Sequence, residues 1–119
     1  MSTNATITVE DNGKFYTNYV HWDGYVSGGV GEALVTHWND LEKALQLVQD
    51  VPGIRTLGDI DNDSVEFFKE DISSTVYDDY EDLLEHYGQE FNYLFTDAGS
   101  EDGQPRWIWD KGEVADELY

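Results

Sequence analysis

The stretch ATITVEDNGKFYTNYV, residues 5–20, decides how the fold begins, because it predicts a β-hairpin. Its first half alternates apolar and polar residues with β-branched side chains, and its second half is a strand-like, aromatic-rich run. Asn12 and Gly13 lie between the halves, and Asn-Gly readily takes the positive φ angles of a two-residue turn. We therefore expect two antiparallel strands joined at Asn12-Gly13.

The next stretch, HWDGYVSGGVG at residues 21–31, places aromatic residues beside four glycines. It is either a ligand site or the joint between the hairpin and the following helix. We favour the joint, because the glycines permit a tight turn and a close approach of helix to sheet. Trp22 and Tyr25 then supply core or rim aromatics, and Asp23 makes a turn or cap hydrogen bond.

A long amphipathic helix is predicted over about residues 30–50, because apolar residues recur there at spacings of three and four. Pro52-Gly53 ends this helix and begins a connector, VPGIRTLGDI. The apolar stripe consists of Val30, Leu34, Trp38, Leu41, Leu45 and Val48.

The second half of the chain predicts shorter elements. Residues 62–71 are expected to form a short helix and SSTVY, residues 73–77, a short strand. DDYEDLLEHYG predicts an acidic helix over about 78–87, with Asp78 and Glu81 as a capping box and Gly88 as its end. EFNYLFT and RWIWD, residues 90–96 and 106–110, predict a second hairpin around an acidic loop.

These elements predict an α+β fold. A small antiparallel sheet carries one long amphipathic helix, about 30–50, and a shorter acidic helix, about 78–87. With 119 residues and no long linker, we expect a single domain over 1–119. The tail KGEVADELY is expected to be a frayed end or a final short helix.

Composition limits the class of protein. Aromatic residues make up 14% of the chain, which favours a folded domain over a disordered acidic tail. The absence of cysteine excludes disulfides and thiolate metal sites. No apolar run is long enough to cross a bilayer, so we expect no membrane partner and a cytoplasmic location.

The net charge of −20 is the unusual property of this chain. Direct nucleic-acid binding is excluded, because it requires clusters of Lys and Arg. The charge is uneven: residues 1–58 carry −4 and residues 59–119 carry −16. This concentration predicts an acidic face for a basic partner protein. The candidate partner-binding residues are Asp59, Asp61, Asp63, Glu66, Glu70, Asp71, Asp78, Asp79, Asp82, Glu85, Asp97, Glu101 and Asp102.

The acidic helix suggests how such a face would act. Asp78, Asp82 and Glu85 are expected on one side of it, with axial spacings of roughly 6 and 4.5 Å at 1.5 Å rise per residue. Phosphates advance about 3.4 Å per strand along a DNA duplex. A row of carboxylates at this pitch can occupy phosphate-binding pockets on a basic protein. The alternative is a solvated helix face without a partner.

Other chemistry has weaker support. Residues 59–70, DIDNDSVEFFKE, match the acidic spacing of a calcium loop, but Ser64 replaces the glycine of the sharp turn. His21, His37 and His86 lack the spacing of a zinc site. No nucleophile motif or phosphate loop is present. We therefore expect no metal, no cofactor and no enzymatic activity, and the sequence leaves calcium binding at 59–70 open.

The residues HWDGY, followed by Val30, Gly31 and Leu34, resemble a family of small proteins encoded by phages and prophages. The similarity covers about residues 15–50. This chain has Val26 where the family has proline, and an extra glycine at Gly28-Gly29. The resemblance implies a phage origin, and thus action in the cytoplasm of a host cell.

Acidity and implied origin together predict a non-enzymatic inhibitor. Its acidic surface would mimic DNA and bind a basic nucleic-acid-binding host protein, such as a defence nuclease, nucleoid protein or polymerase. The alternative is a protein-interaction module that uses the aromatic surface of His21, Trp22, Asp23 and Tyr25. In that case the acidity serves solubility or salt adaptation. The sequence leaves the oligomeric state open.

Overall fold

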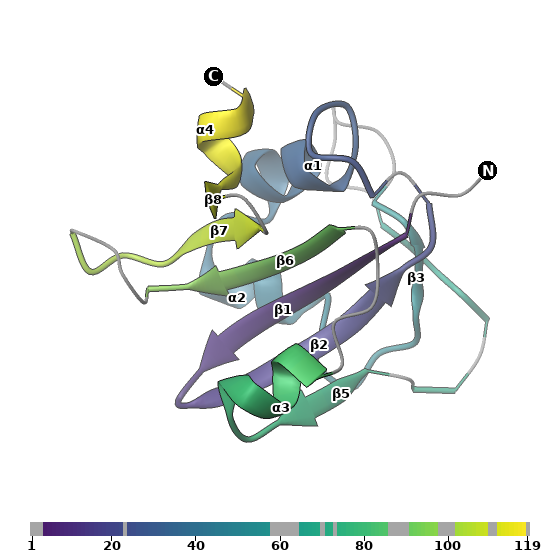
Figure 1. Cartoon of the computed structure of the whole chain (residues 1–119). Helices are drawn as coiled ribbons and strands as arrows, with labels where there is room; N and C mark the ends of the chain where they lie inside the picture. The colour runs from purple at the N-terminus through teal and green to yellow at the C-terminus, as the bar shows by residue number, and fades with distance from the viewer. Residues whose placement is uncertain are drawn as a thin grey trace.

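The hairpin predicted from residues 5–20 lies in the middle of a sheet (Figure 1). The computed structural model describes residues 4–22, 24–57, 65–69, 71–72, 74–85, 91–97, 102–109 and 112–118. Strands β1 (Ala5–Asp11) and β2 (Lys14–Val20) pair antiparallel from one end to the other. Asn12 and Gly13 turn the chain with φ angles of 54° and 79°. The hairpin prediction is confirmed.

Eight strands form one mixed sheet with the order β4-β3-β2-β1-β6-β7-β8, and β5 also pairs with β2. The β1–β6 and β2–β3 pairs are parallel, and the other pairs are antiparallel. The remaining strands are β3 (Ile54–Thr56), β4 (Glu66–Phe67), β5 (Thr75–Tyr77), β6 (Phe91–Thr96), β7 (Arg106–Trp109) and β8 (Gly112–Glu113). The described helices are α1 (Val30–His37), α2 (Leu41–Leu45), α3 (Tyr80–Glu85) and α4 (Val114–Leu118).

The predicted fold class, a small antiparallel sheet under one long helix, is therefore wrong. The structure is mostly sheet, and α1 is the single described helix with more than six residues. The connector after Pro52 contains β3, which pairs with β4. The short helix predicted at 62–71 is also wrong, because β4 lies within that range. Strand pairing therefore replaced the predicted connector in one place and the predicted helix in the other.

The long helix predicted over residues 30–50 is interrupted between Trp38 and Asp40. Asp40 is extended, with φ −144° and ψ 160°, and its carboxylate accepts a 2.8 Å hydrogen bond from the Lys43 amide. It therefore caps a second helix, α2, because an aspartate at this position satisfies an amide that has no partner within the helix. Apolar spacing continued across the break, although the helix did not.

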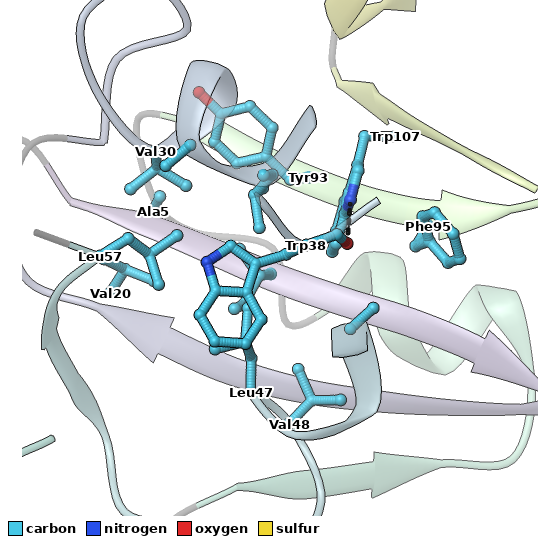
Figure 2. Close-up of a cluster of buried hydrophobic side chains, with 14 of the residues drawn as sticks. Ala5, Val20, Val30, Trp38, Leu47, Val48, Leu57, Tyr93, Phe95 and Trp107 are labelled. Carbon is cyan, nitrogen blue, oxygen red and sulfur yellow. Dashed lines mark hydrogen bonds between the residues drawn. The ribbon is translucent and has the colours of Figure 1, made fainter. Parts of the chain in front are cut away.

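The two helices still cover one face of the sheet. Side chains alternate between the faces of a strand, and Ala5, Ile7 and Val9 of β1 all point into this core, fully buried. Figure 2 shows the large aromatic side chains of the core, including Trp38 of the α1–α2 break and Trp107 of β7. The Trp107 indole donates a 3.0 Å hydrogen bond to the Trp38 carbonyl, so β7 is tied to the end of α1.

One polar side chain organises the turn after α2. Asn18 of β2 is buried on the same face, and its amide donates to the carbonyls of Leu47 and Pro52 at 2.9 and 2.8 Å. Buried carbonyls without partners are costly. Asn18 thus holds the chain between α2 and β3 against the centre of the sheet.

The opposite face carries a smaller cluster beneath α3. Phe15, Leu83 and Leu94 are buried there, whereas Tyr80 and Leu84 of α3 are exposed. The acidic helix predicted at 78–87 is thus confirmed in its centre, and residues 86–90 lie outside the described residues. Its cap is Asp79, which accepts from the Asp82 amide at 2.8 Å, rather than the predicted Asp78.

The remaining elements largely follow expectation. β6 and β7 form the second hairpin, β5 is the predicted short strand, and the tail contains α4. Across the described part of the chain, none of the helices has both the length and the apolar character needed to span a bilayer.

The break between α1 and α2 gives the first prediction. Asp40→Ala removes the cap of α2 and should lower the free energy of unfolding by about 0.5–2 kcal/mol. Glu42→Ala, on the exposed first turn of the same helix, is the matched control and should change it less. Urea unfolding followed by circular dichroism measures both. A continuous helix would give the contrary result, since alanine would then stabilise position 40.

Candidate functional site

Carboxylates from distant parts of the sequence meet at one end of the sheet. β1 and β6 run parallel, with Val9 opposite Phe95, so their carboxyl ends emerge side by side. Asp11 and Asp97 follow two residues later, and both border one hollow of ≈400 Å³. Its walls are Glu10, Asp11, Asn12, Gly13, Leu41, Asp97 and Pro105.

Helix α3 extends this acidic region across the hairpin turn (Figure 1). Lys14 directly follows the turn, and its ammonium group lies 3.0 Å from the Asp78 carboxylate. The Phe15 and Tyr80 rings, 5.9 Å apart, hold the start of α3 against β2. We call the resulting surface the acidic end, and it comprises Glu10, Asp11, Asp78, Asp79, Asp82 and Asp97. Asp102 is exposed before β7 and accepts a hydrogen bond from the Gln104 amide.

Two members of the acidic end were missed by sequence reasoning. Glu10 and Asp11 belong to the less acidic half of the chain, so the distribution of charge did not draw attention to them. Glu10 is half-buried and accepts a hydrogen bond from the Thr96 hydroxyl, which joins β1 to β6. Their position beside the Asn12-Gly13 turn was the available signal, because it places them at the tip of the hairpin.

Other predicted residues lie elsewhere. Glu66 is on β4 and borders a different hollow, and Asp71 is exposed between β4 and β5. Glu85 is exposed at the end of α3. Asp78 precedes α3, so the predicted row of Asp78, Asp82 and Glu85 along one helix is wrong. Asp59, Asp61, Asp63, Glu70 and Glu101 lie outside the described residues.

Aromatic side chains gather at the far end of β2. His21 contacts Trp22 edge to face, with ring centroids 4.7 Å apart at 80°, and Phe68 at 5.7 Å and 67°. The Tyr19 hydroxyl forms a 2.7 Å hydrogen bond with His21 Nδ1. Partial burial raises the pKa of the Tyr19 phenol, which keeps this hydroxyl protonated. Trp22 remains 40% exposed.

Two cations border the same aromatic group. The Arg55 guanidinium lies 5.9 Å from the centroid of the Phe68 ring, and Lys69 follows Phe68 in the chain. The aromatic side chains and these two cations line a hollow of ≈680 Å³, which we call the aromatic corner. Its lining residues are His21, Trp22, Arg55, Glu66, Phe67, Phe68 and Lys69.

The described residues of HWDGYVSGGVG connect β2 to α1, and His21 and Trp22 among them also line the aromatic corner. The Tyr93 hydroxyl donates a 2.7 Å hydrogen bond to the Gly24 carbonyl and fixes the loop to β6. A Cβ on Gly31 would lie 2.7 Å from the Val26 Cα, so only glycine permits this approach. Tyr25 is 43% exposed and does not line the aromatic corner. Asp23 lies outside the described residues.

No group of three or more potential metal ligands lies among the described residues. The calcium loop suggested at 59–70 falls mostly outside them, and its described part, 65–69, contains strand β4 (Glu66–Phe67) instead of the start of a helix. His37 is half-buried at the end of α1, and His86 lies outside the described residues.

Comparison with known proteins yields no match to a protein family, to a curated protein or to a solved structure. The similarity to phage-encoded proteins therefore stays a prediction. The two surfaces that bear on function are the acidic end and the aromatic corner.

The ion pair at the acidic end gives the second prediction. A hydrogen bond and the charge of Asp78 raise the pKa of the Lys14 ammonium group. The pair therefore stabilises the fold below the unfolded pKa of lysine, about 10.4, and this contribution is lost as the pH rises through the raised value. NMR titration of Lys14 Nζ should show a higher pKa in the native protein than in Asp78→Asn. An unchanged titration in that variant would contradict the pairing.

Proposed function

We propose that the protein is a non-enzymatic inhibitor whose acidic end mimics DNA and binds a basic nucleic-acid-binding protein. A phage origin, with a defence nuclease, nucleoid protein or polymerase of the host cell as the target, is part of this proposal. The observation that carries it is the convergence of Asp11, Asp78 and Asp97 at one end of the sheet. These residues come from three segments that are distant in the sequence.

The spacing of these carboxylates supports the proposal. Neighbouring strands lie on the order of 5 Å apart, so the ends of β1 and β6 hold Asp11 and Asp97 at about that separation. Phosphates on one DNA strand advance about 3.4 Å along the duplex axis and further along the backbone. Strand ends are also better fixed than helix side chains, because both strands continue into the buried core.

Charge separation along the sheet supports it further. Lys14 at the acidic end is engaged by Asp78, whereas Arg55 and Lys69 lie at the aromatic corner. A surface with charge of one sign attracts a partner with charge of the opposite sign and accelerates its association. Salt weakens this effect. Arg106, beside Thr96 at the same end, is engaged by Glu113. The acidic end thus presents an excess of negative charge to a basic cleft.

The aromatic surface supports a second candidate function. Trp22 and Tyr25 are 40% and 43% exposed, and large exposed aromatics are typical anchors of protein interfaces. His21 is half-buried behind Trp22. A protein-interaction module would use this surface, and the acidity would then serve solubility.

The two candidates are separated by a matched pair of charge variants. Asp11→Asn with Asp97→Asn removes two charges from the acidic end, whereas Asp116→Asn with Glu117→Gln removes two exposed charges from α4. Hydrogen bonds to charged groups contribute about 1.5–3 kcal/mol each. The first pair should therefore weaken binding of a basic partner about tenfold or more, and the second pair much less.

Capture of basic proteins from a bacterial lysate, at low and high salt, measures this effect. We expect salt and duplex DNA to release the proteins captured by the unmodified chain. Equal loss in both variant pairs would indicate bulk charge instead of a defined surface. Loss in Trp22→Ala or Tyr25→Ala, with the acidic-end variants unaffected, would favour the aromatic module.

A further inference from the structure

The aromatic corner contains two cations, Arg55 and Lys69. Within the described part of the chain, neither Arg55 nor Lys69 forms an ion pair, whereas Lys14 and Arg106 do. This is unexpected in a chain with 26 acidic and six basic residues. Even Glu66, which lines the same hollow, makes no ion pair with them. The two positive groups are therefore available to an anion.

The walls of the hollow are aromatic. Trp22 and Phe68 both contact the His21 ring, and each meets it at a steep angle. The hydrogen bond between the Tyr19 hydroxyl and His21 Nδ1 holds the His21 ring in place. Rings that are already ordered lose little conformational entropy when a flat ligand packs against them. The volume of ≈680 Å³ lies within the usual range of small-molecule sites.

The corner is electrostatically separate from the acidic end. β2 runs from Lys14 beside the acidic end to Val20 beside the corner, a length of about 20 Å at the usual rise per residue. The Debye length at physiological ionic strength is about 8 Å. The acidic end is therefore largely screened at the corner, where Arg55, Lys69 and Glu66 are the charged residues that line the hollow.

We propose that the aromatic corner binds a small anion with a planar aromatic ring, the class that includes nucleoside monophosphates and aromatic carboxylates. The ring packs against Trp22 and Phe68, and the anionic group lies between Arg55 and Lys69. Glu66 accepts a hydrogen bond from a ring amine or hydroxyl. This site is distinct from the acidic end, and it stands whether or not the proposed inhibitor function holds.

The test uses the whole chain and probes in which ring and charge are separated. AMP and indole-3-acetate carry both features, adenosine carries the ring alone, and inorganic phosphate carries the charge alone. Binding is followed by the NMR shifts of the Phe67 and Phe68 backbone amides, which every variant retains, and of the Trp22 indole N–H where it is present. We expect at least one of the two ring-bearing anions, AMP or indole-3-acetate, to shift these resonances in a saturable manner. Adenosine and phosphate should have little effect. Tighter binding of AMP would identify a phosphate as the preferred anionic group, and tighter binding of indole-3-acetate a carboxylate.

Two variants and two matched controls locate the site. Trp22→Ala should weaken binding of the anion by roughly tenfold, as expected when a base loses an aromatic stacking partner. Arg55→Gln should weaken it severalfold. Tyr25→Ala, equally exposed but outside the hollow, and Lys43→Gln, an exposed lysine on α2, should leave it unchanged.

Three results would overturn the proposal. The first is the absence of a saturable shift with both anions. The second is an equal response to inorganic phosphate alone. The third is unchanged binding in Trp22→Ala and Arg55→Gln while their amide spectra show a native fold. Should Trp22→Ala fail to fold, Arg55→Gln still decides the question, because the Arg55 side chain is exposed.

Discussion

The pairing of β1 along both of its edges is the constraint on which the rest of the structure depends. β2 occupies one edge through the Asn12-Gly13 turn, and β6 occupies the other in parallel register, from Ala5 opposite Phe91 to Val9 opposite Phe95. Because β1 is central, the side chains on its apolar face are fully buried beneath the helices. β6 in turn fixes β7, whose Trp107 binds the end of α1. The position of α1 thus follows from a strand pair some 85 residues apart in sequence.

The same pairing creates the acidic end. Antiparallel pairing of β1 with β6 would have placed Asp97 at the opposite end of the sheet from Asp11. Parallel pairing brings Asp11 and Asp97 to the hairpin tip. There Lys14 forms an ion pair with Asp78, which lies just before α3. The aromatic corner lies at the other end of β2, with two cations, Arg55 and Lys69, that form no ion pair with any of the described residues. A strongly acidic chain therefore carries two surfaces of different chemistry on one sheet.

Local signals in the sequence predicted those elements that local interactions determine. The Asn12-Gly13 hairpin, the β6–β7 hairpin and the centre of α3 depend on turns, caps and short-range periodicity. The parallel partners of β1 and β2 have no such signal, since nothing near Phe91 or Ile54 in sequence specifies a distant strand. The helix over 30–50 failed for another reason. Its apolar spacing is real, but the Asp40 carboxylate caps a new helix, so the chain is not one continuous helix despite the periodicity.

The candidate site was predictable in part for the same reason. The distribution of charge along the sequence identified candidates for an acidic face, namely Asp78, Asp79, Asp82, Asp97 and Asp102. It gave no indication that Glu10 and Asp11 belong to the same face. The aromatic stretch HWDGY was noticed, yet its cations, Arg55 and Lys69, come from β3 and the end of β4. Both surfaces depend on pairings that only the folded structure shows.

The most direct test of this account is the strand direction of β1 and β6 in solution. NOEs between amide and Hα protons should connect Ile7 with Tyr93 and its neighbours, and Val9 with Phe95 and its neighbours, in the pattern of a parallel pair. Antiparallel NOEs, or none between these strands, would separate Asp11 from Asp97. That result would contradict the fold and, with it, the acidic end.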